Sequence, residues 1–147
     1  MLGVRDNSNQ RLNVLLSTGE QIWADHLPRL LEPQGVHAIR VSDVDQALDV
    51  IEHHRIHAAV IETGGDRNRQ GLKLLQVIRR MSPTPPAVLV RGRLFDRRDD
   101  NRLLADALKF NAFSVLDQPV HLEQILDTLR RLLERYYGGQ WPTASKS

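Results

Sequence analysis

The chain of 147 residues contains no cysteine, and its 20 Lys and Arg residues against 18 Asp and Glu residues leave a net charge of only +2. This composition excludes disulfides, thiolate metal sites and cysteine nucleophiles, and its charge does not indicate a nucleic-acid partner. Because the N-terminal residues lack the apolar core of a signal peptide and no stretch approaches the ~20 apolar residues of a membrane span, we expect one soluble, cytoplasmic domain.

The first part of the chain alternates strand-length apolar runs with segments of helical periodicity. Residues 12–17 and 36–41 are predicted strands. Between them, residues 21–31 have the apolar spacing of a helix, which Pro28 is expected to kink or restart. After the second strand, Ser42 is the predicted cap of a helix with a buried apolar stripe. That stripe consists of Ala47, Leu48 and Ile51.

The rest of the chain repeats this alternation. Residues 58–61 are a continuously apolar predicted strand, as expected when both faces of a parallel sheet are covered. A loop over residues 62–70 leads into a predicted helix that ends at Arg80, with Leu72, Leu75 and either Val77 or Ile78 facing inward. The later predicted elements are a strand over 87–90, a helix over 99–111, a strand over 113–116 and a helix over 121–137. The last helix has one broad apolar stripe of Leu122, Ile125, Leu126, Leu129, Leu132, Leu133 and Tyr136.

Strand followed by helix, five times with short connections, predicts an α/β fold. Its doubly wound, five-stranded parallel sheet should have helices on both faces. We expect this domain over residues 11–137, between flexible tails at 1–10 and 138–147. In such folds a ligand site lies beyond the carboxyl ends of the strands. The residues expected at that edge are Thr18, Gly19, Glu62, Arg91, Gln118 and Pro119.

Four segments, in this order and spacing, resemble the CheY-like receiver domains of two-component response regulators. These segments are LNVLLSTGE (12–20), ALDVI (47–51), GLKLLQVIR (71–79) and QPVHLE (118–123). The resemblance covers about residues 11–137 and implies a flavodoxin-like sheet with strand order 2-1-3-4-5. It further implies a signalling module of a phosphorelay, with signalling proteins as partners, no cofactor and no enzymatic activity of its own.

The acidic chemistry of receivers is largely missing from this chain. Where the family has two acidic residues that hold Mg²⁺, this chain has Thr18 and Gly19, which supply no charge. The phosphoacceptor aspartate of the family corresponds to Glu62, which is one methylene longer. If the register shifts by one residue, Thr63 takes that position and the site loses its carboxylate.

The remaining positions of the receiver site are replaced as well. Arg91 stands where the family has a Ser or Thr that bonds the phosphoryl group, and Gln118 stands where it has a Lys. Pro119 is retained, so we expect the cis peptide bond that this position usually has in the family. Together the replacements indicate a degenerate receiver that does not use aspartyl phosphorylation, and no catalytic residue is predicted.

Three interpretations of Glu62 remain open. Its carboxylate could place a permanent negative charge where a phosphoryl group would be, or it could form a charge-assisted pair with Arg91. Alternatively, both side chains are solvated and have no joint role. If the pair forms, replacing Arg91 with Ala should destabilise the fold.

Other chemistry is indicated more weakly. An unconventional phosphoacceptor would use Glu62 or Asp66, and a small anionic ligand would use the 64–65 glycine loop with Arg91. The cluster of His53, His54 and His57 lacks converging carboxylates, so no metal site is expected.

The output is expected to be a contact with another protein, because no output domain follows residue 137. By the resemblance, the contact face would comprise the predicted fourth helix, fifth strand and fifth helix, and it could also form a homodimer. Nucleic acid is not an expected partner, since the charges of the 91–102 segment alternate in sign. Its predicted residues are Arg98, Arg102, Asp106, Lys109, Asp127, Arg130, Arg131 and Glu134.

Overall fold

The computed structural model describes residues 11–19, 21–63, 68–91, 105 and 112–138. The predicted N-terminal tail, and the predicted C-terminal tail except Gly138, lie outside these residues. So does the helix predicted over residues 99–111, except for Ala105. Within the described ranges, no helix is both long enough and apolar enough to cross a membrane.

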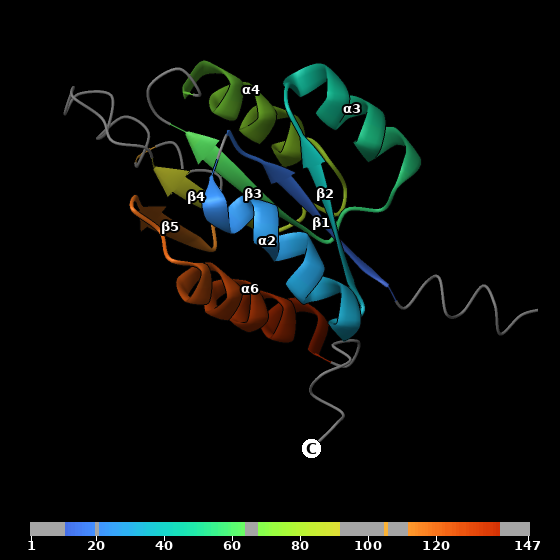
Figure 1. Cartoon of the computed structure of the whole chain (residues 1–147). Coiled ribbons are helices and arrows are strands. Elements are labelled where there is room, and N and C mark those ends of the chain that lie inside the picture. The colour runs from blue at the N-terminus through green and yellow to red at the C-terminus, as the bar shows by residue number, and fades with distance from the viewer. Residues whose placement is uncertain (1–10, 20, 64–67, 92–104, 106–111, 139–147) are drawn as a thin grey trace, which may run out of the picture.

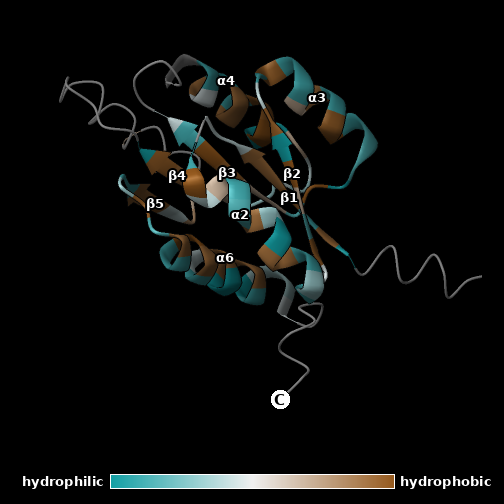
Figure 2. Cartoon of the chain, viewed as in Figure 1, coloured by the Kyte–Doolittle hydropathy of each residue, from teal (hydrophilic) through white to brown (hydrophobic). Residues whose placement is uncertain are grey.

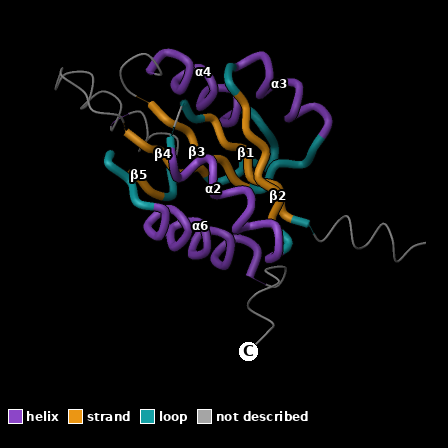
Figure 3. Tube along the Cα trace, in the orientation of Figure 1, coloured by secondary structure: helices purple, strands orange, loops and turns teal. Residues whose placement is uncertain are grey.

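Five parallel strands form one sheet in the order β2-β1-β3-β4-β5 (Figures 1 and 3). This arrangement confirms the predicted doubly wound sheet and its strand order. Because these strands are parallel, the carboxyl ends of β1, β3 and β4 lie at one edge of the sheet, where polar residues follow each apolar run. The strands are β1 (Leu12–Ser17), β2 (Val36–Val41), β3 (Ala58–Thr63), β4 (Ala87–Arg91) and β5 (Ser114–Asp117).

Helices cover both faces of the sheet, as predicted. Helices α2 and α6 lie side by side on one face, and α3 and α4 lie on the other (Figure 1). Their bounds are α2 (Ile22–Leu31), α3 (Val44–His53), α4 (Asn68–Arg79) and α6 (Leu122–Tyr137), and a short 3-10 helix, Glu32–Gln34, follows α2.

Alternate residues of each strand belong to different cores, because successive side chains of a strand point to opposite faces. Val60 and Val90 belong to the core beneath α2 and α6, whereas Ile61 and Leu89 belong to the core beneath α3 and α4. Figure 2 shows the resulting hydrophobic strands between helices that carry both polar and apolar residues. A shift of one residue along a strand therefore moves a side chain to the other layer.

Several predicted boundaries were wrong, most clearly around β3. This strand continues through Glu62 and Thr63, two residues beyond its predicted end, and α4 already begins at Asn68. The two polar residues stay in the sheet because they are in register with Val90 and Arg91 of β4. Strand β5 is Ser114–Asp117, one residue later than predicted, and β4 also ends one residue later than predicted.

Helix α2 does not restart at Pro28, contrary to one of the two expectations for this residue. It is continuous over Ile22–Leu31, and the N–H of Glu32 still donates to the carbonyl of Pro28. Leu27 and Leu31 are buried on either side of the proline, so the apolar stripe holds the helix against the sheet.

The cap of α3 is Asp43 rather than Ser42. The Asp43 carboxylate accepts a bond of 2.8 Å from the N–H of Gln46, and the N–H of Ser42 donates to the Gln46 side chain. Asp43 has the extended backbone of an N-cap, one turn before the bonded N–H, so it satisfies an otherwise unpaired donor. Of the predicted stripe in α3, Ala47 is buried and Leu48 is exposed.

The apolar stripes of α4 and α6 also needed correction. In α4, Ile78 rather than Val77 is buried, and Leu74, which was not predicted, is buried as well. In α6, Tyr136 is half exposed, whereas Tyr137 packs against the core and donates a bond of 2.8 Å to the carbonyl of His57.

His57 is buried at the opposite end of the sheet from the candidate site. Its Nδ1 accepts a bond of 3.0 Å from the N–H of Asn13, and its ring meets that of Tyr137 edge to face. Burial lowers the pKa of His57, and the charge of Arg55 lowers it further. Among the described residues, no group of three or more His, Asp or Glu side chains could hold a metal ion.

We expect the stability of the protein to fall in mild acid because of His57. Its pKa is lower in the folded state, so the unfolded state binds the proton first, and stability is lost as the pH falls below about 6.5. The free energy of unfolding in urea, measured from pH 8 to pH 5, should decline by at most about 1.4 kcal/mol per pH unit through this group.

The His57→Gln variant keeps an acceptor for Asn13 but cannot titrate, so its acid decline should be smaller than that of the wild type. His53→Gln is the matched control, because Asp49 raises the pKa of His53, and that histidine contributes stability at low pH instead. An undiminished acid decline in His57→Gln would contradict this assignment.

Candidate functional site

Glu62 lies at the centre of the carboxyl edge of the sheet. It is the penultimate residue of β3 and is in register with Val90, so its side chain belongs to the α2 and α6 layer. Only 7% of the residue is exposed. A carboxylate this buried needs hydrogen-bond partners to offset its lost hydration.

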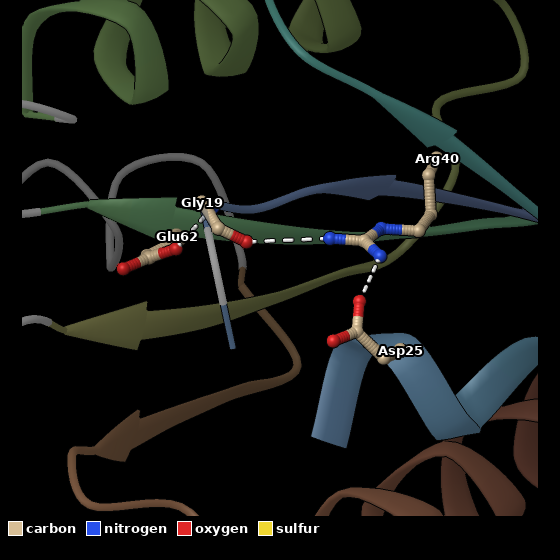
Figure 4. Close-up of polar contacts among 4 residues, drawn as sticks. All are labelled: Gly19, Asp25, Arg40 and Glu62. Carbon is tan, nitrogen blue, oxygen red and sulfur yellow. Dashed lines mark hydrogen bonds and ion pairs between the residues drawn. The ribbon is translucent and has the colours of Figure 1, made fainter. Parts of the chain in front are cut away.

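Three N–H donors surround the Glu62 carboxylate. The backbone N–H of Gly19 donates to Oε1 at 2.6 Å (Figure 4). The side-chain amides of Gln21 and Gln118 both donate to Oε2, at 3.0 and 3.1 Å. Glu62 therefore joins the β1–α2 connection, β3 and the β5–α6 connection, and we call Gly19, Gln21, Glu62 and Gln118 the Glu62 hub.

The peptide of Gly19 is held from its other side as well. Arg40 Nη2 of β2 donates to the Gly19 carbonyl at 3.4 Å, and Arg40 Nη1 donates to Asp25 Oδ1 of α2 at 2.5 Å (Figure 4). The position where receivers carry an acidic metal ligand is thus a glycine peptide with hydrogen bonds at both its N–H and its carbonyl.

Glu62 does not pair with Arg91, contrary to one of the interpretations from sequence. Arg91 is in register with Thr63 of β3 and with Asp117 of β5, so its side chain starts on the α3 and α4 layer. Its Nε donates to Asp117 Oδ1 at 2.5 Å. The expected pair fails because Glu62 and Arg91 differ by one position in register and so lie on opposite faces.

Coupling between Arg91 and Asp117 should be measurable. Arg91 is 20% exposed and Asp117 65%, so solvent screens the pair and we expect a coupling of about 0.5–1 kcal/mol. A double-mutant cycle with Arg91→Gln and Asp117→Asn, read from urea unfolding, measures it. Arg91→Ala should accordingly destabilise the fold, although through Asp117.

The same cycle between Arg91→Gln and Glu62→Gln is the control, and it should be additive. The exposed pair of Asp127 and Arg131, 3.2 Å apart on α6, provides a second comparison with an expected coupling of about 0.3–0.5 kcal/mol. Coupling of Arg91 to Glu62 but not to Asp117 would contradict the observed register.

Among the described residues, the other predicted pocket residues make no hydrogen bond to the Glu62 carboxylate. Thr18 is buried, and its hydroxyl has no hydrogen-bond partner within the part of the chain that the structure describes. The peptide bond between Gln118 and Pro119 is cis, as predicted. Thr63 is fully buried on the opposite layer, with its hydroxyl 3.5 Å from the carbonyl of Val90. Glu62, rather than Thr63, therefore lies on the same side of the sheet edge as Gly19 and Gln118.

The sequence reasoning missed Gln21 and Arg40. Gln21 is the N-cap residue of α2 and lies two positions after Gly19. Its position in the sequence could therefore have predicted that it lies near the site. Arg40 lies in the interior of β2, and nothing in the sequence places it beside Gly19.

The chemical capacity of the Glu62 hub follows from its donors. The carboxylate accepts three N–H bonds, so its two oxygens are engaged within the protein. Within the described part of the chain, Glu62 belongs to no group of three or more His, Asp or Glu side chains that could hold a metal ion. The arrangement suits a fixed anionic junction between three segments better than a nucleophile.

The predicted interaction face is only partly described. Arg98, Arg102, Asp106 and Lys109 lie outside the described residues, as do Asp66 and the 64–65 glycine loop. The four remaining members of the face lie on α6 and are exposed: Asp127, Arg130, Arg131 and Glu134.

The fold is that of receiver domains. The signal receiver domain of an HD domain-containing protein from Pseudomonas fluorescens Pf-5 matches with a TM-score of 0.71 and 22% identity, over 87% of this chain and 98% of its own. A response regulator from Thermotoga maritima matches with a TM-score of 0.68 and 16% identity, over 84% and 98% of the two chains.

The receiver domain of a LuxO repressor protein from Vibrio parahaemolyticus gives a TM-score of 0.70 at 14% identity, over 88% of this chain and 95% of its own. No protein-family model and no curated protein matches the sequence. Similarity at these identities establishes the fold and leaves function to the residues of the site.

Proposed function

We propose that this chain, which has the fold of response regulator receiver domains, is a signalling module that works without aspartyl phosphorylation and acts by binding other signalling proteins. In this proposal it belongs to a two-component type of system, catalyses no reaction and needs no cofactor.

The observation that carries this proposal is the engagement of the Glu62 carboxylate. A phosphoacceptor must offer an oxygen to an incoming phosphoryl group, with a cation to offset the developing charge. Here Oε1 faces the Gly19 N–H and Oε2 faces two glutamine amides. Attack by either oxygen would require these bonds to break within a buried site, with no lysine at position 118 to assist.

The same bonds support a domain held in one state. A receiver that responds to phosphorylation must rearrange its strand-end loops when the site is charged. In this chain the Glu62 carboxylate joins three such segments directly. Unlike a phosphoryl group, it is not added and removed. Its permanent charge therefore favours a constitutive arrangement, as in the first interpretation from sequence, although the charge is satisfied internally.

The proposal is tested by incubating the protein with acetyl phosphate and Mg²⁺ and measuring its intact mass. We expect no phosphorylated species, and equal co-purification of any bound partner with and without the phosphodonor. A phosphorylated species that is lost in Glu62→Gln would instead support the unconventional phosphoacceptor.

Partner binding is expected to involve the exposed charges of α6. The mixed charges of Asp127, Arg130, Arg131 and Glu134 favour a surface that is complementary to a mixed-charge partner, including a second copy of this chain. Sedimentation velocity at two salt concentrations distinguishes a salt-sensitive homodimer from a monomer that awaits a different partner.

A further inference from the structure

A pocket of about 420 Å³ opens beside the Glu62 hub, between the first turns of α2 and α6. Figure 1 shows these helices on one face of the sheet, with their first turns at the same end. The walls include Ile22, Trp23 and His26 of α2 and the Val120, His121 and Leu122 segment. Gln21, Gln118 and Pro119 complete the lining, so the pocket shares one wall with the degenerate receiver site and extends from it between the two helices.

Two helix N-termini converge on this pocket. The N-cap residues are Gln21 for α2 and His121 for α6, and neither side chain caps its helix. The first N–H groups of a helix have no acceptor within it, and the helix dipole makes this end positive. A pocket with two such ends favours an anion.

Trp23 provides an independent indication of a ligand. It lines the pocket and is only 4% exposed, yet its indole Nε1 has no hydrogen-bond partner among the described residues. A buried donor without an acceptor costs about 1–3 kcal/mol. An acceptor oxygen bonded to this N–H would recover part of that cost.

The charges and side chains around the pocket define the class of ligand. Two neighbouring carboxylates already accept hydrogen bonds within the protein: Glu62 from its hub and Asp25 from Arg40. A third, Glu123 in the first turn of α6, is exposed to solvent. Apolar side chains supply much of the remaining wall, so the pocket combines donors with a hydrophobic lining. We propose that it binds a small organic carboxylate with an apolar body.

A carboxylate bound in the pocket would lie beside the Glu62 hub. Gln21 and Gln118 both line the pocket, and both donate to Oε2 of Glu62. A carboxylate in the pocket would therefore contact two of the three donors of Glu62 and bias the segments that they join. The binding itself does not depend on whether Glu62 accepts phosphate, so the two proposals fail independently.

The test titrates ¹⁵N-labelled protein with benzoate and, separately, with benzamide, which has the same ring without the charge. The chain has two tryptophans, and a Trp141→Phe variant assigns the indole N–H signal of Trp23. We expect benzoate to shift this signal and the side-chain amides of Gln21 and Gln118, and benzamide to shift them far less. Equal shifts from both compounds, or no shift from benzoate at millimolar concentration, would overturn the proposal.

A matched pair of variants at Ile22 tests the location. Ile22 is 79% exposed and is the first residue of α2, where a carboxylate is tolerated and even favourable for the helix. Ile22→Asp places a negative charge beside the pocket, and Ile22→Asn places a side chain of the same shape without the charge. We expect Ile22→Asp to weaken benzoate binding by about tenfold or more relative to Ile22→Asn. Equal affinities of the two variants would place the anion elsewhere.

Discussion

Replacement of Glu62 by Ala should lower the free energy of unfolding by about 2–4 kcal/mol, because it leaves the Gly19 N–H and two glutamine amides without their acceptor in a buried site. The carboxylate is the shared partner of three segments, so its loss also loosens the β1–α2 and β5–α6 connections. Urea unfolding followed by circular dichroism measures this change.

Two further variants separate hydrogen bonding from charge. Glu62→Gln keeps an acceptor for Gly19 but removes the charge, so its loss should be smaller, about 1–2 kcal/mol. Glu123→Ala, an exposed carboxylate in the first turn of α6, is the matched control and should cost less than about 1 kcal/mol. A Glu62→Ala protein as stable as Glu123→Ala would show that the hub contributes nothing to the fold.

Replacement of Gly71 by Ala should destabilise the protein by about 1–3 kcal/mol, because α4 approaches the end of β3 too closely for a side chain. A Cβ at this position would lie 2.6 Å from Cγ2 of Thr63 and 2.9 Å from the carbonyl oxygen of Glu62. The methyl group would press directly on the strand that carries Glu62. A thermal unfolding scan should therefore show a clearly lower Tm.

Gly138→Ala is the matched control for this substitution. A Cβ at Gly138 meets nothing within 4 Å, and its φ of −50° suits any residue, so its Tm should be unchanged or slightly higher. Adding Thr63→Ser to Gly71→Ala removes the nearer clash and should restore part of the stability, while the contact with the Glu62 carbonyl remains. An unchanged Tm in Gly71→Ala would contradict the close approach of helix and strand.

The sequence was sufficient for the architecture because apolar runs and helical stripes depend on local patterns. The first four residues of β3 are continuously apolar, and α6 repeats its leucines at helical spacing, so both elements were predicted with the correct type. Boundaries were less certain, since Glu62 and Thr63 remain in the sheet through pairing with β4, a contact between segments distant in sequence.

The candidate site could be predicted only as a set of residues at one edge. Which of them meet depends on register, and a shift of one residue moves a side chain to the other layer. That is why Glu62 meets Gln118 and Gly19, while Arg91 meets Asp117. Arg40 was missed because its bond to the Gly19 carbonyl depends on the length of its side chain and on the position of Asp25.

The most direct test of the central claim is an amide NMR titration with Mg²⁺ and then beryllofluoride, a mimic of an aspartyl phosphate. The N–H of Gly19 is the reporter, because it donates to Glu62 Oε1 and would change if that oxygen took another partner. We expect no magnesium-dependent shift of Gly19 or of the Gln118 side-chain amide at millimolar Mg²⁺. Shifts of both signals that require Mg²⁺ and grow with beryllofluoride would contradict the account and show that Glu62 is a working phosphoacceptor.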